Sequence, residues 1–326
     1  MRAILCKAWG EVSSLALQEI APRSPAPGEI RLRVRACGVN FADTLMVAGK
    51  YQFRPPLPFS PGMEMAGEVL EVGKDVAGIT PGERVVAMSY YGGFAEEATI
   101  PAGLVIPLPP AMDDVTAAAF PGAYGTAHMA LWHRARLQPG ERLLVLGAAG
   151  GVGLSAVEIG ALMGAEVIAA ASTDEKLALA RKHGAAHTIN YSHEPLRGRV
   201  REITAGQGVD VVFDPVGGDL FKAAFRSVAW EGRYLVVGFA SGEIPQTSVN
   251  RLLIDNFALV GVEWGTYTRR GSPLVRQSLK MLLGWWEQGR IRPHVSATYP
   301  LARTVEALEE VLARRTTGRV VILPHE

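Results

Sequence analysis

Runs of apolar residues alternate with helix-like segments along the middle of the chain. Four apolar residues at 143–146 lead into small residues at 147–153, and a helical pattern of apolar positions follows. Five further apolar runs come later, each after a helical or loop segment, at 166–170, 187–189, 209–213, 233–238 and 257–262. This alternation predicts an α/β fold with a six-stranded, doubly wound parallel sheet.

The first hundred residues have a different pattern. Short β-type runs, such as 30–35 and 84–87, lie between turns that place Pro before Gly at 25–29 and 80–83. Several short strands joined by tight turns are typical of an antiparallel, barrel-like domain.

Helical patterns connect and follow these two regions. One begins at 112–119 with acidic residues in its first turn, and another runs from 124 to 134. After the last strand of the sheet come an apolar helix at 273–288, an amphipathic helix at 304–314 and a closing strand at 319–323. We expect the last segments to return to the first domain. The predicted domains are 125–265 for the parallel sheet, and 1–124 with 266–326 for the barrel-like domain.

Composition narrows the class of protein. The 326 residues carry a net charge of +1 and are 48% hydrophobic, with no basic stripe that would favour nucleic acid. The only cysteines, Cys6 and Cys37, exclude a disulfide framework and a four-cysteine zinc lobe. The chain has no signal-like N-terminus and no apolar run of membrane-spanning length. We expect a cytoplasmic protein that acts on small molecules, with neither a nucleic-acid nor a membrane partner.

The run of small residues after the first strand carries the strongest functional signal. Its glycines let the backbone approach a pyrophosphate closely, and the following helix presents free N–H groups to that anion. An ordinary strand-to-helix turn is the alternative, but the strand series favours a dinucleotide-binding (Rossmann) domain. The residues expected to hold the pyrophosphate are Ala149, Gly150, Gly151, Val152 and Gly153.

The end of the second strand indicates which dinucleotide is bound. NAD-specific domains place a carboxylate there for the ribose 2′-hydroxyl. Here Ser172 and Thr173 follow the strand, with Lys176 one turn later, and these side chains suit a 2′-phosphate. The expected cofactor is therefore NADPH. The alternative is that Asp174 or Glu175 reaches back to the ribose.

Two motifs resemble the medium-chain dehydrogenase/reductase superfamily. In its zinc alcohol dehydrogenases, a Cys-Gly-Val-Cys-His and a Pro-Gly-His-Glu motif hold the catalytic metal, and here Asn40 and Met63 stand at the ligand positions. An amide and a thioether do not replace a thiolate and an imidazole on zinc, so no metal is expected. The chain is most similar to the zinc-free, zeta-crystallin-like quinone oxidoreductases, which implies a GroES-like barrel beside the Rossmann domain.

The resemblance also implies roles for particular residues. Asn40 would orient the cofactor or the substrate where the metal is missing, and Tyr51 would donate to a substrate carbonyl, with packing at the surface as the alternative. Trp264 follows the last strand of the parallel sheet, and from that position it would stack over a planar quinone. Loops that follow the carboxyl ends of strands would line the cofactor. The further cofactor contacts implied are Thr126, Tyr191, Val216, Gly217, Phe239, Ala240, Ser241 and Arg319.

The expected reaction is hydride transfer from NADPH to a quinone or related conjugated carbonyl. Conjugation spreads the delivered charge, which lessens the need for a metal. One alternative is reduction of an enone or an enoyl-CoA thioester, whose anionic tail Arg269 and Arg270 would attract. Another is an NADPH-binding structural or RNA-binding protein with little turnover. The apolar edge strand 257–262 predicts a homodimer, as in family members that pair this strand across a two-fold axis.

Overall fold

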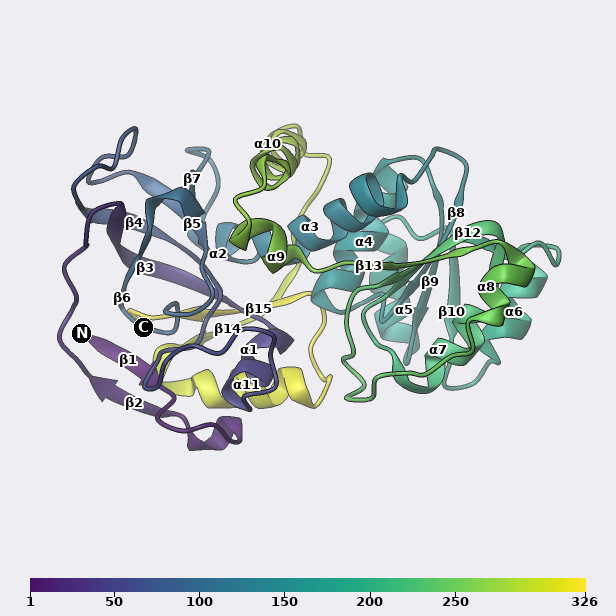
Figure 1. Cartoon of the computed structure of the whole chain (residues 1–326), viewed down its shortest axis with the longest axis horizontal. Helices are drawn as coiled ribbons and strands as arrows, with labels where there is room; N and C mark the ends of the chain where they lie inside the picture. Colours follow the sequence, from purple (N-terminus) through teal and green to yellow (C-terminus); the bar gives the residue numbers. More distant parts are fainter. The chain divides into compact units, whose positions relative to one another are not determined.

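A computed structural model describes residues 1–326 (Figure 1). The chain divides into two compact units, residues 1–122 with 293–326, and residues 123–292. The segment 266–292, which the sequence assigned to the barrel-like domain, is thus part of the second unit. Its helix α10 (Pro273–Glu287) is held there by Ser278, whose hydroxyl lies 2.8 Å from His128 Nδ1, and by Trp285, whose ring meets the His128 ring edge-on.

The second unit contains the parallel sheet that the sequence predicts. Its strand order is β10-β9-β8-β11-β12-β13, and every neighbouring pair is parallel, which confirms the doubly wound α/β fold. The strands are β8 (Arg142–Leu146), β9 (Glu166–Ala171), β10 (His187–Asn190), β11 (Val209–Asp214), β12 (Val228–Val236) and β13 (Ala258–Gly261).

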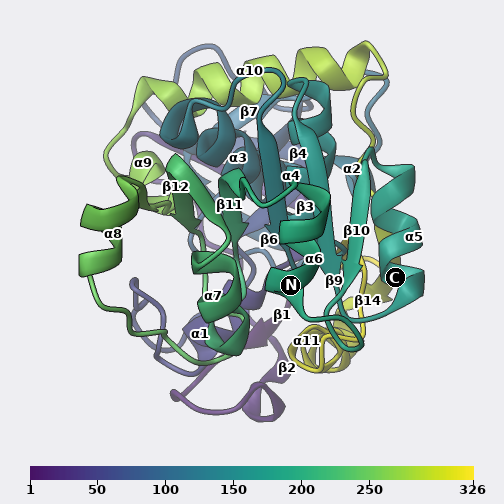
Figure 2. The same cartoon turned by 90° about the vertical axis from the view of Figure 1, so that its right-hand side faces the viewer.

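Helices cover both faces of this sheet. Figure 2 shows α6 and α7 in front of the strands and α4 behind them. The helix predicted at 124–134 begins as an α-helix and continues as a π-helix over Met129–Ala135. The helices are α3 (Pro121–His128), α4 (Gly151–Leu162), α5 (Asp174–Lys182), α6 (Leu196–Ile203), α7 (Gly218–Phe225), α8 (Asn250–Asp255), α9 (Trp264–Arg269) and α10.

The first unit is built on a seven-stranded sheet rich in antiparallel pairs. Its order is β14-β15-β3-β4-β5-β7 with β6 on β3, and only β14 and β15 run parallel. Strands β1 and β2 form a separate hairpin-like pair. The strands are β1 (Arg2–Leu5), β2 (Ala16–Glu19), β3 (Glu29–Val39), β4 (Glu64–Val72), β5 (Arg84–Met88), β6 (Glu97–Pro101), β7 (Val105–Pro107), β14 (Val295–Pro300) and β15 (Arg319–Leu323). The helices are α1 (Phe41–Val47), α2 (Asp114–Ala118) and α11 (Thr304–Leu312), with short 3-10 turns at Val12–Ser14, Ala102–Leu104 and Leu301–Arg303.

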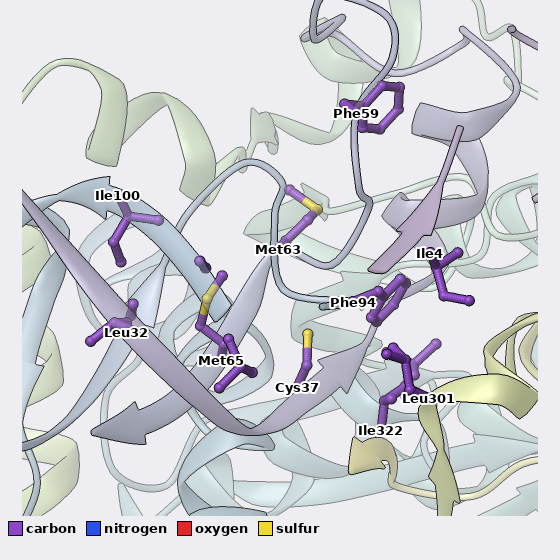
Figure 3. Packing of buried hydrophobic residues seen from close by; sticks show 14 of the residues in the cluster. Ile4, Leu32, Cys37, Phe59, Met63, Met65, Phe94, Ile100, Leu301 and Ile322 are labelled. Carbon is purple, nitrogen blue, oxygen red and sulfur yellow. The ribbon is translucent and has the colours of Figure 1, made fainter. Parts of the chain in front are cut away.

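The core of the first unit lies along β3, β4 and β15. Figure 3 shows Cys37 and Met63 pointing into it among aliphatic and aromatic side chains. Met63 is 6% exposed, and Cys37 is fully buried as a free thiol. Cys37 and Met63, which lie in the stretches that correspond to the zinc-enzyme motifs, therefore serve here as apolar packing. None of the helices has the length and apolar character that crossing a membrane requires.

Candidate active site

The predicted cofactor residues of the second unit gather at one edge of the parallel sheet. Strands β8 to β12 all run in the same direction, so their carboxyl ends lie at the same edge. The glycine loop follows β8, Ser172 follows β9, Tyr191 follows β10, and the loops of Val216 and Phe239 follow β11 and β12. The structure thus brings these segments together as the sequence predicted, while Thr126 lies on α3.

The glycine loop is closely packed. Gly150 is the N-cap of α4 and has no side chain, so the N–H groups in the first turn of the helix receive no hydrogen bond from a capping side chain. A Cβ atom on Gly153 would lie 2.2 Å from the carbonyl oxygen of Gly147. Only glycine fits at 153, and the helix start therefore lies directly against the turn that follows β8.

The side chains that follow β9 are arranged to suit a 2′-phosphate on the cofactor better than a free ribose 2′-hydroxyl. The Asp174 carboxylate accepts a hydrogen bond of 2.8 Å from Asn190 Nδ2. Glu175 interacts with the Thr173 side chain and the backbone at the start of α5, which lowers the pKa of its carboxyl. Thr173 itself caps α5 by accepting from the Lys176 amide. Both acids therefore have local roles in the structure.

Two loops beyond β11 and β12 are joined by backbone hydrogen bonds. The amides of Ala240 and Ser241 donate to the carbonyls of Pro215 and Val216 at 3.0 and 2.9 Å. Gly217 has a positive φ of 67°, and the ring of Phe239 lies beside it. These bonds hold the two loops against each other beyond the carboxyl ends of β11 and β12.

Asp214 and Tyr234 support these loops, and the sequence analysis missed both. One Asp214 oxygen accepts from the amides of Val216 and Gly217, and the other accepts from the Tyr234 hydroxyl at 2.6 Å. Burial raises the pKa of Asp214 in spite of these three donors. The signal was present in an acid that directly follows the apolar residues 211–213, where a partner is required.

The structure buries the Trp264 side chain, whereas stacking over a quinone requires an accessible ring. Trp264 begins α9, is 5% exposed, and lies with its ring against Gly125 of α3. Arg269 is also engaged locally, since it pairs with the Glu263 carboxylate that caps α9. Neither residue is presented to solvent as a free binding group.

A buried polar cluster in the first unit contains the position of the missing metal ligand. Arg319 Nη1 donates to Asn40 Oδ1 at 2.9 Å, and Asn40 Nδ2 donates to Glu64 Oε1 at 3.0 Å. Arg319 also forms an ion pair with Glu64, which is fully buried. The other Glu64 oxygen accepts from the Gly122 amide at 2.6 Å. Asn40 and Arg319 were predicted to belong to the site, whereas Glu64 was not predicted to bind them.

Two glycines make room for this ion pair. A Cβ atom at Gly38 would lie 2.6 Å from Glu64 Oε1 and 2.8 Å from Arg319 Nη2, and one at Gly122 would lie 2.6 Å from Glu64 Oε2. Arg319 Nε has no hydrogen-bond partner although it is buried. Burial lowers the pKa of Arg319 to about 10, so the guanidinium remains charged at neutral pH.

Asp43 completes the cluster from the first turn of α1. Its carboxyl accepts hydrogen bonds from the Asn40 amide at 2.8 Å and the Gly62 amide at 3.2 Å. Burial raises the pKa of Asp43 to about 7 in spite of these amides and the nearby Arg319 charge. Asp43 thus orders the Asn40 turn, while Tyr51 lies beyond the other end of α1, half-buried against the core.

The raised pKa of Asp43 predicts a specific pH dependence of stability. The folded protein holds this proton up to about pH 7, whereas the unfolded chain releases it near 3.8. Asp43 therefore favours folding fully below the lower value, and its contribution falls as the pH rises and is lost above about pH 7. Urea unfolding of the wild type and Asp43→Asn should show their free-energy difference changing by up to about 4 kcal/mol over this range.

Asp75→Asn, at an exposed loop carboxyl, is the matched control. Its difference from the wild type should stay constant over the same pH range. A constant difference for Asp43→Asn as well would contradict the assignment.

Comparisons with known proteins identify the family. Residues 26–110 match a model described as alcohol dehydrogenase GroES-like domain, and residues 151–281 match one described as zinc-binding dehydrogenase. Quinone oxidoreductase-like protein 2 of Rattus norvegicus is 42% identical over 309 residues, covering 94% of this chain and 88% of the rat protein. The chain belongs to the medium-chain dehydrogenase/reductase family.

Solved structures of this family agree with the fold. Escherichia coli quinone oxidoreductase in complex with NADPH superimposes with a TM-score of 0.91 at 30% identity, covering 99% of this chain and 100% of that one. A 2-haloacrylate reductase superimposes with a TM-score of 0.86 at 33% identity and covers all of both chains. The chain is therefore a medium-chain oxidoreductase of the quinone oxidoreductase-like group, with the Rossmann and GroES-like domains that the sequence predicts.

The zinc site of some medium-chain dehydrogenases does not fit this chain. Asn40 directs its amide to Glu64 and Arg319, and Met63 lies in the apolar core. No three histidine, cysteine, aspartate or glutamate side chains gather where they could hold a metal ion. An amide and a thioether are poor zinc ligands, so the donor set disagrees with the description of the matching family model.

Proposed function

We propose that this oxidoreductase transfers hydride from NADPH to a quinone or related conjugated carbonyl without a metal. The observation that carries the proposal is the cluster of Asn40, Glu64 and Arg319, in which Asn40 stands at the position of the metal ligand and is hydrogen-bonded to a buried ion pair. NADPH is the bound dinucleotide in the E. coli relative, and the glycine loop and the end of β9 here suit it.

The residues at the sheet edge would hold the cofactor. The N–H groups at the start of α4 would bind its pyrophosphate, and Ser172 and Lys176 its 2′-phosphate. Asn40 keeps one amide hydrogen beyond its bond to Glu64, and its half-buried side chain can donate it to a ribose hydroxyl or a substrate oxygen. Arg319 Nε, which lacks a protein partner, is the donor in the same cluster for a cofactor oxygen.

The bound NADPH supplies the hydride, and the chain supplies orientation and hydrogen bonds. A quinone or enone spreads the incoming negative charge over its conjugated system, so hydrogen-bond donors and a solvent proton suffice for the acceptor oxygen. A simple aldehyde or ketone localises that charge on one oxygen and therefore gains more from a Lewis acid, which this donor set does not provide.

Reduction of an α,β-unsaturated acyl compound is the second candidate, because a 2-haloacrylate reductase is among the similar structures. A panel of quinones, enones and enoyl-CoA thioesters, with oxidation of NADPH followed by absorbance, distinguishes the candidates. Faster turnover of quinones supports the proposal, whereas preference for a thioester or an acrylate moves the assignment to the second candidate. NADPH binding without turnover of any acceptor would support a binding protein instead.

Lys176→Ala is expected to weaken NADPH binding about tenfold while leaving NADH binding nearly unchanged, because one charge-assisted contact to the 2′-phosphate is lost. Lys182→Ala, at the other end of α5, is the control and should change neither affinity. Dissociation constants from nicotinamide fluorescence give the comparison. Equal losses for NADPH and NADH would contradict a 2′-phosphate contact.

We propose that the protein is located in the cytoplasm, because its two cysteines are free thiols and a reducing compartment keeps thiols free. We also propose that the chain forms a homodimer through β13. This strand ends the sheet order, and Leu259 on it is 42% exposed. Leu259→Glu should convert a dimer to a monomer in light scattering, because the charge would face the partner strand. Leu17→Glu, at an exposed position of β2, is the control. A wild-type monomer would contradict the proposal.

A further inference from the structure

The chain passes between its two units at two places, and the Glu158 carboxylate accepts a hydrogen bond from a residue next to each of them. The passages lie between residues 122 and 123 and between residues 292 and 293. Tyr124 is the second residue after the first passage, and Arg292 is the last residue before the other. Both donate hydrogen bonds to Glu158, in the middle of α4.

The contacts divide between the two carboxylate oxygens. The Tyr124 hydroxyl donates to Oε2 at 2.5 Å, and the Arg292 backbone amide donates to Oε1 at 3.0 Å. His183 Nδ1 lies 3.4 Å from Oε1. Tyr124 is 2% exposed and the Glu158 side chain 12% exposed, so water competes little for the bond between them, whereas the hydrogen bond from the Arg292 amide lies at an exposed position.

The same helix begins at the glycine loop. Glu158 lies two turns beyond Gly151, the first residue of α4, so the bound segments are fixed to the element whose N-terminus faces the cofactor phosphates. The first connecting segment is also held on its other side, where the Gly122 amide donates to Glu64 of the polar cluster. Connecting segments are the places where rotation between two units concentrates.

We propose that Glu158 is a positioning residue that ties both connecting segments to the cofactor-binding helix, and that hydride transfer depends on this tie. The inference rests on the proposed function, because its main readout is the rate of the proposed hydride transfer. Glu158 itself touches neither substrate nor cofactor. Its effect is therefore on the rate of the bound complex rather than on cofactor affinity.

Three variants separate the tie from a general contribution to stability. Glu158→Ala removes both contacts, while Glu158→Gln keeps an acceptor for the Arg292 amide and an amide donor for the Tyr124 oxygen. Glu141→Ala is the matched control, because Glu141 is a partly buried carboxylate of the same unit, paired with Arg233 and remote from both passages in sequence. Tyr124→Phe removes one contact and serves if Glu158→Ala fails to fold.

The expected results are a selective loss of turnover and a local change in exchange. Glu158→Ala should lower kcat about tenfold, Tyr124→Phe by less, and Glu158→Gln should recover most of the loss. The dissociation constant of NADPH should stay within about twofold, and Glu141→Ala should keep its kcat. Hydrogen exchange at the Arg292 amide should quicken in Glu158→Ala and stay slow in Glu158→Gln.

Several results would overturn the inference. The first two are a kcat of Glu158→Ala equal to that of Glu141→Ala, and a loss of NADPH affinity in Glu158→Ala as large as its loss of kcat. The others are a kcat of Glu158→Gln as low as that of Glu158→Ala, and a rate of hydrogen exchange at the Arg292 amide that Glu158→Ala leaves unchanged. Failure of the proposed function has a different signature, since the wild type itself would then reduce no acceptor. The exchange measurement still tests the tie in that case.

Discussion

Gly153→Ala is expected to abolish NADPH binding within the concentration range of an ordinary titration. The new Cβ atom would lie 2.2 Å from the Gly147 carbonyl oxygen, which is a backbone atom and cannot rotate aside. The start of α4 must then move away from the turn after β8, and the N–H groups that face the pyrophosphate move with it. The same displacement should lower the free energy of unfolding by about 1–3 kcal/mol.

Gly284→Ala is the matched control in the same unit. Gly284 lies in α10, and its added Cβ atom would meet nothing within 4 Å. This variant should bind NADPH as the wild type does and gain up to about 1 kcal/mol of stability, because alanine favours a helix over glycine. Unchanged cofactor affinity in Gly153→Ala would show that the glycine loop is not the pyrophosphate site.

Glu64→Gln is expected to cause the largest loss of stability, about 3 to 5 kcal/mol. The substitution keeps the shape of the side chain but leaves the buried Arg319 charge without its ion-pair partner. Turnover should fall as well, since Asn40 is held between these two side chains. Chemical denaturation at neutral pH and steady-state kinetics give the two readings.

An exposed ion pair provides the control for this prediction. Glu306 pairs with Arg303 near the start of α11, where solvent screens both charges, so Glu306→Gln should have little effect on stability or turnover. A loss no greater in Glu64→Gln than in Glu306→Gln would contradict a buried charge pair at the site.

Local patterns in the sequence were sufficient to predict the parallel sheet and the edge at which the carboxyl ends of its strands lie. The predicted strands of the second unit correspond to β8 through β13, and the clearest is β8, because a strand buried on both faces is rich in continuous apolar residues. The glycine loop and the groups after β9 are contiguous segments whose role follows from their position after a strand. The carboxyl ends then meet at one edge because the strands are parallel.

The polar cluster could not be predicted in the same way. Asn40 and Arg319 are 279 residues apart, and their contact depends on β15 pairing with β3. Nothing local to Glu64 indicates that its partners are an arginine on β15 and the Gly122 amide. Likewise, the apolar pattern of α10 indicates that this helix packs against other elements but not that His128 of α3 lies against it.

The most direct test of a metal-free NADPH reductase is kcat for a quinone before and after metal removal. The protein is treated with a chelator, its metal content is measured by mass spectrometry, and turnover with NADPH is compared before treatment, after it and after addition of zinc. The proposed function predicts the same kcat in all three samples. Activity that disappears with the metal and returns with zinc would contradict it.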